Sequence, residues 1–407
     1  MNDPTQDAVA PAVPASFAQP APVRPTPRRL EIRFTGSGSE YFRIWIVNLL
    51  LTIVTLTLYH PFAKVRRLRY FYANTLVDEH ALGFHGDPWK MLRGYALVGA
   101  MLALYSVAGH FSAGAGLVAF LVVAGIWPGL IKSSLQFRMA NTSWRGLRFR
   151  FTGTVAEAYR ATLPLFVPGL VLLAALLGVP DQERPPAWYG AVLAVVTIGA
   201  VACAPWLWWS LKKYQHDHLA YGPLQTELQC GAAPVYAVFG KTLAVALLGA
   251  LALGALFFLL VLGVGMGSLG DLRGPNSGKR MAAMMIIGFA VFGVGVLAVQ
   301  LVPRPYFTSR MQNLLWSRTV TPRTLRFNSA LRFRPLFGLT LKNWLLVVLT
   351  LGLYWPFAAI ATARLRLEAV NLDLALDPQT LVDQGRALEG EAAGDAAGDL
   401  FGLDIGL

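Results

Sequence analysis

Charged side chains are scarce in this sequence. Only 14% of the 407 residues are Asp, Glu, Lys or Arg, whereas 55% are hydrophobic and the mean hydropathy is +0.50. Soluble domains carry about 25% charged residues, since such residues solvate their surface. The composition therefore excludes an ordinary soluble domain and indicates an α-helical protein that crosses a membrane several times.

The sequence also lacks the patterns of common catalytic and metal chemistry. It contains no Walker-type phosphate loop, no HExxH or GxSxG motif and no CxxC pair. Its two cysteines, Cys203 and Cys230, are too few for a disulfide framework and are not spaced as metal ligands. We therefore expect no enzyme activity, no cofactor and no metal site.

The net charge of +13 does not indicate nucleic-acid binding. The basic residues follow the apolar runs, where they set membrane topology and meet lipid headgroups. The partners that this pattern predicts are anionic membrane lipids. A homo-oligomer and a protein partner both stay open at this point.

Three regions follow from the distribution of apolar residues. Residues 1–28 are rich in Pro and Ala and lack the features of a signal peptide, so we expect a disordered tail. Residues 29–375 form the membrane domain, and residues 376–407 form an acidic tail. Eight apolar runs have membrane-crossing length, near 42–62, 92–111, 115–131, 161–180, 187–209, 241–266, 281–302 and 339–358.

One apolar and basic stretch occurs near both ends of the membrane domain. It reads NLLLTIVTLTLYHPFAKVRRLRYFYAN in the first half and NWLLVVLTLGLYWPFAAIATARLRLEAVN near the end. The stretch is a membrane element that the chain repeats. Seven residues match at one constant offset: Asn48, Thr55, Leu58, Tyr59, Pro61, Phe62 and Arg69 correspond to Asn343, Thr350, Leu353, Tyr354, Pro356, Phe357 and Arg364.

A short β-like motif precedes the apolar part of this unit. It begins at Phe34, Phe84 and Phe151, and in weaker form at Leu228. The unit of motif, membrane segment, proline and basic helix occurs about five times, with two apolar runs in each of the middle three copies. We therefore predict an all-α polytopic membrane protein of about five pseudo-repeats, with short β-like cytoplasmic elements.

Charge predicts which side the loops face. Paired runs return the chain to the side it left, and the long loops 63–93, 131–160, 210–241 and 303–342 hold 23 of the 35 Lys and Arg residues. The positive-inside rule places these loops in the cytoplasm. The first and last runs either cross the membrane fully or turn back within it, and charge favours re-entrant segments with cytoplasmic termini.

One group of basic residues has two interpretations. These residues are topology determinants, or they hold an anionic headgroup by charge and bidentate hydrogen bonds among neighbouring aromatic rings. The candidate headgroup residues are Lys64, Arg66, Arg67, Arg69, Arg138 and Arg310.

Ionisable groups are nearly absent from the apolar runs, which disfavours a proton relay. The main polar residues there are Asn48, Asn343 and Gln300. They either join helices by amide hydrogen bonds or line a polar pathway.

The acidic tail also has two interpretations. It is solvated, or it docks across the basic loops with Phe401, Leu403 and Ile405 as anchors.

The sequence resembles the YjgN family of bacterial inner-membrane proteins. The resemblance rests on FTGSGSEYF, on LTLTLYHPFAKVRRLRYFYANT, on the FHG copy and on the DLFGLDIGL ending. It implies a multi-pass protein of the bacterial inner membrane, and it implies no established activity or catalytic residue.

Two function classes are consistent with these features. The first is a transporter or channel for a small or amphipathic solute, because internal repeats are common in transporters. The second is a non-enzymatic envelope protein that binds anionic lipid or scaffolds partners through its basic cytoplasmic face. A continuous polar cavity would favour the first class, and basic grooves on a solid bundle would favour the second.

Overall fold

The computed structural model describes residues 28–268 except 182, residues 301–395 except 323, and isolated positions between these two ranges. Eleven strands lie in the described part of the chain: β1 (Arg28–Phe34), β2 (Thr75–Val77), β3 (His80–Phe84), β4 (Thr142–Trp144), β5 (Leu147–Phe151), β6 (Leu219–Tyr221), β7 (Leu224–Gln225), β8 (Glu227–Leu228), β9 (Thr319–Thr321), β10 (Leu325–Ser329) and β11 (Val370–Leu374).

These strands form one antiparallel sheet that closes on itself. Their order is β7-β6-β5-β4-β3-β2-β1-β11-β10-β9-β8. The two outermost strands, β7 and β8, are consecutive in the chain and are separated only by Thr226. The sheet is therefore a nearly closed ring, which we call the barrel.

The barrel corrects the expectation of an all-α fold. The β-like motifs begin at Phe34, Phe84 and Phe151, which are the last residues of β1, β3 and β5. The rest of each motif connects the strand to the next helix and begins that helix. Several of the strands are only two or three residues long, so their pattern in the sequence is weak. Four pairs, β2–β3, β4–β5, β6–β7 and β9–β10, are local hairpins. The other pairs join segments far apart in the chain, and only this tertiary pairing makes one sheet of the hairpins.

Between paired strands, the described chain makes five helical excursions away from the barrel. Each excursion leaves on one strand and returns on its antiparallel neighbour. In all five, the residue after the outgoing strand donates a backbone hydrogen bond to the residue before the returning strand. The pairs are Thr35 and Asn74 (2.9 Å), His85 and Asn141 (2.8 Å), Thr152 and His218 (3.0 Å), Gln229 and Arg318 (2.8 Å), and Ala330 and Ala369 (2.9 Å).

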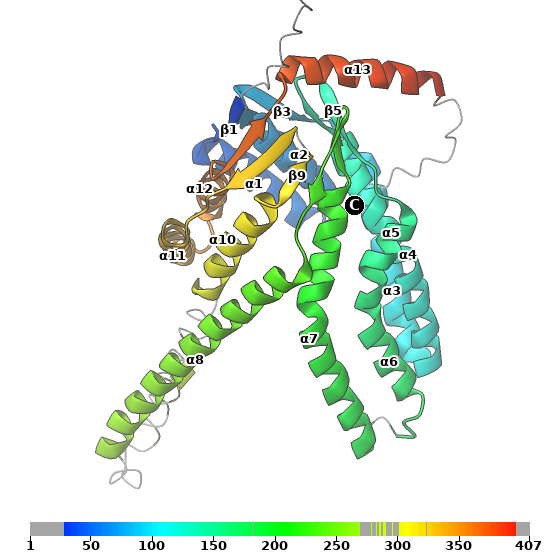
Figure 1. Ribbon diagram of the computed structural model, residues 1–407. Coiled ribbons are helices and arrows are strands. Elements are labelled where there is room, and N and C mark those ends of the chain that lie inside the picture. Colours follow the sequence, from blue (N-terminus) through cyan, green and yellow to red (C-terminus); the bar gives the residue numbers. More distant parts are fainter. Residues whose placement is uncertain are drawn as a thin grey trace, which may run out of the picture.

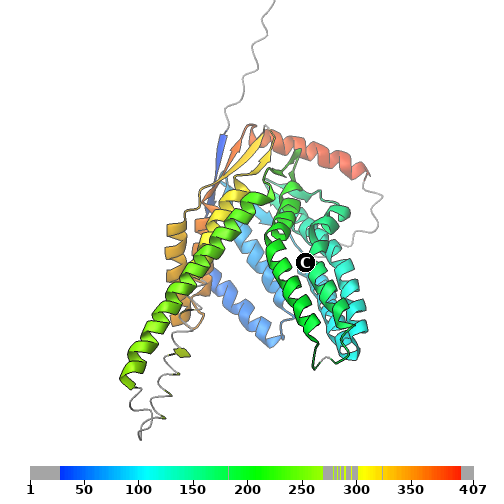
Figure 2. The ribbon, with the colours of Figure 1, turned by 60° about the horizontal axis from the view of Figure 1, so that its bottom comes forward.

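The excursions place their helices at one end of the barrel, and α13 lies across the other end (Figures 1 and 2). The α-helices described are α1 (Gly38–Val54), α2 (His60–Ala73), α3 (Pro88–Phe111), α4 (Ala113–Ala140), α5 (Val155–Thr162), α6 (Val167–Leu176), α7 (Ala187–Asp217), α8 (Ala232–Ser268), α10 (Pro303–Trp316), α11 (Phe333–Leu349), α12 (Trp355–Leu367) and α13 (Pro378–Asp395).

The first and last apolar runs form helical hairpins. α1 is followed at once by α2, which brings the chain back to β2 beside β1, and α11 and α12 do the same between β10 and β11. The turns place Leu56 (φ 48°), Thr57 (φ 74°), Leu351 (φ 50°) and Gly352 (φ 93°) in the left-handed region. Both runs therefore turn back, as the charge pattern favours.

A threonine supports each of these two turns in the same way. The Thr55 hydroxyl accepts a hydrogen bond from the backbone N–H of Tyr59 at 3.0 Å, and Thr350 accepts one from Tyr354 at 2.9 Å. The sequence places both threonines at matching positions of the repeated stretch. This shared role explains why both stretches have a threonine at this position.

The count of eight membrane-crossing runs is not what the described residues show. Five segments are long and apolar enough to cross a membrane: Pro88–Phe111, Ala113–Ala140, Val155–Leu176, Ala187–Asp217 and Ala232–Ala255. Two of the eight expected runs are the hairpins just described. Most of the run 281–302 lies outside the described residues.

The inside of the barrel is an apolar core that α13 closes. Leu30, Trp144, Leu147 and Tyr221 are buried there, together with further apolar residues from the strands. Leu381 of α13 joins them and is only 1% exposed. This part of the expected acidic tail is thus docked on the barrel. The proposed anchors Phe401, Leu403 and Ile405 lie outside the described residues.

We predict that Gly385→Val releases α13 from the barrel. A Cβ atom at this position would overlap the buried Leu147 side chain and lie 3.1 Å from the Gly222 Cα atom, so the larger Val side chain should push α13 away from the barrel. Overpacking of this kind costs about 1–3 kcal/mol, and trypsin cleavage after Arg386 should become about tenfold faster. Ala387→Val, at an exposed position of the same helix, is the control. Equal cleavage of both variants would contradict the docking.

Candidate functional site

The candidate headgroup residues lie in helix segments that lead directly into the barrel. α2 continues into β2, α4 into β4, and α10 into β9. Because these strands belong to one sheet, the three helices all end beside it. Arg138 lies in the last turn of α4, and the other five residues lie one to three turns before the ends of α2 and α10. We call Lys64, Arg66, Arg67, Arg69, Arg138 and Arg310 the basic belt.

The belt residues of α2 are surrounded by aromatic rings. Lys64 donates a hydrogen bond to the Tyr95 hydroxyl at 3.3 Å and lies 5.2 Å from the centre of that ring. The guanidinium of Arg66 lies 5.6 Å from the ring centre of Tyr59. Arg66 and Arg67 are exposed. Their charge therefore faces the surroundings of the helix, where an anion has access.

Arg69 has a second role that the repeat already indicates. It donates to the carbonyl of Gly86 in the next excursion at 3.1 Å, and its counterpart Arg364 donates to Gly36 at 2.9 Å. Asn313 of α10 donates to Leu331 in the same manner at 3.0 Å. These side chains hold neighbouring excursions together. The correspondence of Arg69 with Arg364 is explained by this contact.

The remaining belt residues lie in two different places. Arg138 donates to the Tyr72 hydroxyl at 3.4 Å, so it lies beside α2. Arg310 lies farther around the ring, because β1, β11 and β10 separate β9 from β2. The belt residues accordingly lie at two places beside the barrel and do not form a single cluster.

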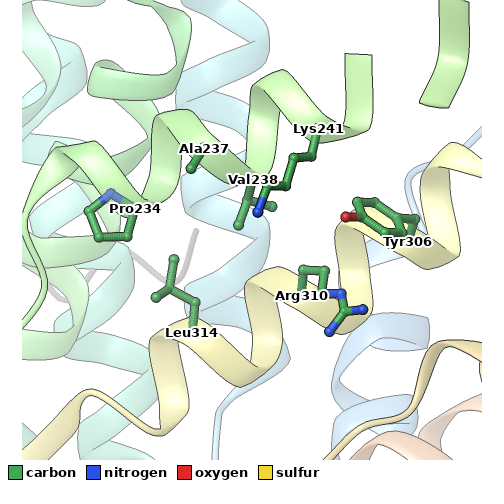
Figure 3. Close-up of a pocket in the computed structure, with 7 residues that line it drawn as sticks. All are labelled: Pro234, Ala237, Val238, Lys241, Tyr306, Arg310 and Leu314. Carbon is green, nitrogen blue, oxygen red and sulfur yellow. The ribbon is translucent and has the colours of Figure 1, made fainter. Parts of the chain in front are cut away.

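Arg310 lines a groove between α8 and α10 that sequence reasoning missed. The groove has a volume of about 400 Å³, and Lys241 of α8 lines it opposite Tyr306 and Arg310 of α10 (Figure 3). The Arg310 guanidinium lies 5.6 Å from the ring centre of Tyr306. Lys241 lies ten residues into a long apolar helix, and this isolated charge is the signal that points to it.

Asn48 and Asn343 are buried in their own hairpins. Each is 7% exposed. The Asn343 amide donates to the Ala358 carbonyl and to the Thr362 hydroxyl of α12, both at 3.3 Å. The Oδ1 atoms of both asparagines have no hydrogen-bond donor among the described residues. Asn343 thus joins α11 to α12, and Gln300 lies outside the described residues.

A further polar contact links α10 to α12. Arg366 donates to the Gln312 side chain at 2.9 Å, and Gln312 donates back to the Arg366 carbonyl at 2.8 Å. Burial lowers the pKa of Arg366, and the nearby charge of Arg304 lowers it further. No sequence motif predicts this contact, because Gln312 and Arg366 lie far apart in the chain.

The described residues hold no group of three or more His, Cys, Asp or Glu side chains that is placed to bind a metal ion. The arrangement offers charge, amide and hydroxyl groups for binding an anion at the barrel end of the helices.

Apolar helices of membrane-crossing length, joined at one end by a capped barrel with a basic rim, define this chain as a helical membrane protein. It belongs to the family described as bacterial protein of unknown function (DUF898), whose model matches residues 29–400. This agrees with the resemblance that the repeated motifs carry.

Three similar proteins are named inner membrane protein YjgN. The one from Salmonella typhimurium strain LT2 is 29% identical over 170 residues, which is 42% of this chain and 43% of that protein. Those from Escherichia coli O157:H7 and strain K12 are 28% and 29% identical over 148 residues, which is 36% of each chain. The matches thus span less than half of these relatives. No solved structure matches the chain.

We predict that Asn343→Leu weakens the terminal hairpin without unfolding the protein. The substitution removes two hydrogen bonds, yet it also relieves an oxygen that has no donor among the described residues. The expected loss is about 1 kcal/mol, read as a small drop in the thermal unfolding temperature in detergent. Val348→Leu, at an exposed apolar position of the same helix, is the control. A loss of unfolding free energy as large as that caused by breaking a buried ion pair would contradict this modest role of Asn343 in joining α11 to α12.

Proposed function

We propose that this chain is a multi-pass inner-membrane protein without enzyme activity that holds anionic phospholipid at the cytoplasmic surface through its basic belt. The observation that carries the proposal is that all six cations lie on α2, α4 and α10, three helices that each lead directly into a strand of the barrel. We further infer that the five excursions are copies of one unit, which is supported by their five equivalent backbone hydrogen bonds.

The location rests on the relatives and on charge. The similar proteins are named inner membrane proteins, and five segments of this chain have the length and hydropathy of membrane spans. The loops that carry most of the basic residues form the barrel and its rim. The positive-inside rule then puts the barrel in the cytoplasm and the opposite ends of the helices on the other side of the membrane.

Lipid contact is supported by the exposure of the apolar helices. Within the five candidate spans, the buried share of the most apolar window is between 0% and 28%. Large apolar side chains such as Leu251 (70% exposed) and Val195 (70% exposed) lie on these helices. Such surfaces suit hydrocarbon, and the belt begins where the helices reach the barrel. A cation near an anionic bilayer contributes about 1 kcal/mol.

Transport of a small or amphipathic solute stays a prediction with less support. A carrier binds its substrate near the middle of the membrane, in a site that protein surrounds. Asn343 contacts its own hairpin, and neither Asn48 nor Asn343 lines the groove at Lys241. Weakly buried helices favour an anchored lipid-binding or scaffolding protein instead.

We predict that the barrel is cytoplasmic. In a Cys203→Ala and Cys230→Ala background, Glu79→Cys reports on the exposed turn between β2 and β3, and Glu183→Cys reports on the exposed loop between α6 and α7. A membrane-impermeant thiol reagent should label position 183 in intact spheroplasts and position 79 only after lysis. Labelling of position 79 in intact spheroplasts would show that the barrel lies outside the cytoplasm, and would contradict the proposal of lipid binding at the cytoplasmic surface.

We predict that Arg66→Gln with Arg67→Gln lowers the anionic phospholipid that co-purifies with the protein. Losing two exposed cations should weaken lipid affinity about tenfold or more, measured as phosphatidylglycerol per protein after detergent washing. The control is Arg29→Gln with Arg148→Gln, which removes two exposed cations from the barrel strands. Arg69 is left intact because it joins two excursions. Equal amounts of co-purified phosphatidylglycerol in both variants would show that Arg66 and Arg67 do not contribute to lipid binding.

A further inference from the structure

The groove between α8 and α10 combines two cations with an apolar wall. Lys241 and Arg310 line it together with Tyr306, and its other lining residues are Pro234, Ala237, Val238 and Leu314. The lining contains no carboxylate. Neither Lys241 nor Arg310 forms an ion pair with any residue that the structure describes. Two uncompensated positive charges that face one groove favour an anionic occupant.

The side chains are arranged to hold an oxyanion. Lys241 extends from α8 toward α10, and the Tyr306 hydroxyl points into the space between the two helices (Figure 3). The Tyr306 ring supports the Arg310 guanidinium at 5.6 Å, which limits the orientations of that group. A guanidinium donates two parallel hydrogen bonds to a phosphate, and an ammonium adds a compact charge.

The surface beyond the groove fits an acyl chain. α8 leaves the barrel after β8, so residues that follow Lys241 lie progressively farther from the barrel. Leu248 lies seven residues on, which places it on the same helix face about 10 Å away. Its side chain is 66% exposed. A ligand with a phosphate at Lys241 and a hydrocarbon tail along Leu248 would cover both surfaces.

We propose that this groove is a specific site for an anionic phospholipid, whose phosphate is bound by Lys241 and Arg310 and whose acyl chain lies along α8. The inference rests on the proposed function and names one site within it. Arg310 is one of the belt residues, whereas Lys241 is a further cation outside the belt. The Tyr306 hydroxyl donates a further hydrogen bond to the phosphate.

The test measures lipid binding to the full chain by native mass spectrometry in a neutral detergent. Phosphatidylglycerol is added to the wild type and to Lys241→Gln with Arg310→Gln, and phosphatidylcholine is the headgroup comparison. We expect the wild type to favour phosphatidylglycerol, and the double variant to bind it about tenfold or more weakly. Arg29→Gln with Arg148→Gln, which changes the net charge equally, should bind as the wild type does.

Two single variants keep the test decisive if the double variant fails to fold. Tyr306→Phe retains the ring beneath Arg310 and removes the hydroxyl, so a modest loss of affinity is expected. Arg310→Lys retains the charge and loses the paired hydrogen bonds, so its affinity should lie between those of the wild type and the double variant. Wild-type affinity in both single variants, with unchanged unfolding temperature, would overturn the site.

The outcomes separate this site from the wider belt. One outcome is that Arg66→Gln with Arg67→Gln lowers lipid binding while Lys241→Gln with Arg310→Gln does not. The proposed lipid site in the groove is then wrong, and the proposal that the belt binds lipid still stands. If neither variant changes binding, both proposals fail. Competition by millimolar inorganic phosphate that removes phosphatidylglycerol completely would show a site for a small anion, and would overturn the assignment to a lipid.

Discussion

Backbone pairing between the first strand, β1, and the last strand of the described chain, β11, holds the architecture together. It joins residues 28–31 to residues 371–374 and so brings the two ends of the membrane domain side by side. Without this pair, β1 and β11 would each present an unpaired edge, which is exposed to wrong pairing. At the other side of the ring β7 and β8 are not paired with each other, but only Thr226 separates them in the chain.

Pairing of adjacent strands determines where each excursion leaves the barrel and where it returns. Each excursion begins and finishes on adjacent strands, so its helices must return to the barrel, whatever distance they travel. Two excursions return to the barrel through a short turn, in the hairpins of α1 with α2 and of α11 with α12. The excursion of α3 and α4 returns through longer helices. The basic residues of α2, α4 and α10 are thereby carried on helices that return to the barrel. The lipid-binding proposal depends on this arrangement.

Several features followed from the sequence because they depend on local patterns. The Phe34 motif and its copies predicted β-like elements, and the first residue of each copy is the last residue of a strand. Arg69 and Arg364 match in the two similar stretches, and each donates to a glycine carbonyl of a neighbouring excursion. Thr55 and Thr350 also match, and both lie where the apolar runs turn. In each case a short segment carries the whole signal.

Other features did not follow, because their causes lie between distant segments. The barrel was missed because its strands are short, and their stability comes from partners that the sequence does not identify. The groove was missed because Lys241 and Arg310 are about seventy residues apart and meet only where α8 packs beside α10. The burial of Leu381 was missed because an acidic composition conceals the apolar side of α13.

By itself, the sequence determined that this is an apolar, basic membrane protein in which two similar stretches lie near the two ends of the membrane domain, since hydropathy, charge and similarity are properties of consecutive residues. Tertiary structure alone decided that the strands form a nearly closed barrel, that α13 covers it, and which cations share a groove. Those outcomes depend on hydrogen bonds and packing between residues far apart in the chain, and no local pattern encodes which of them will meet.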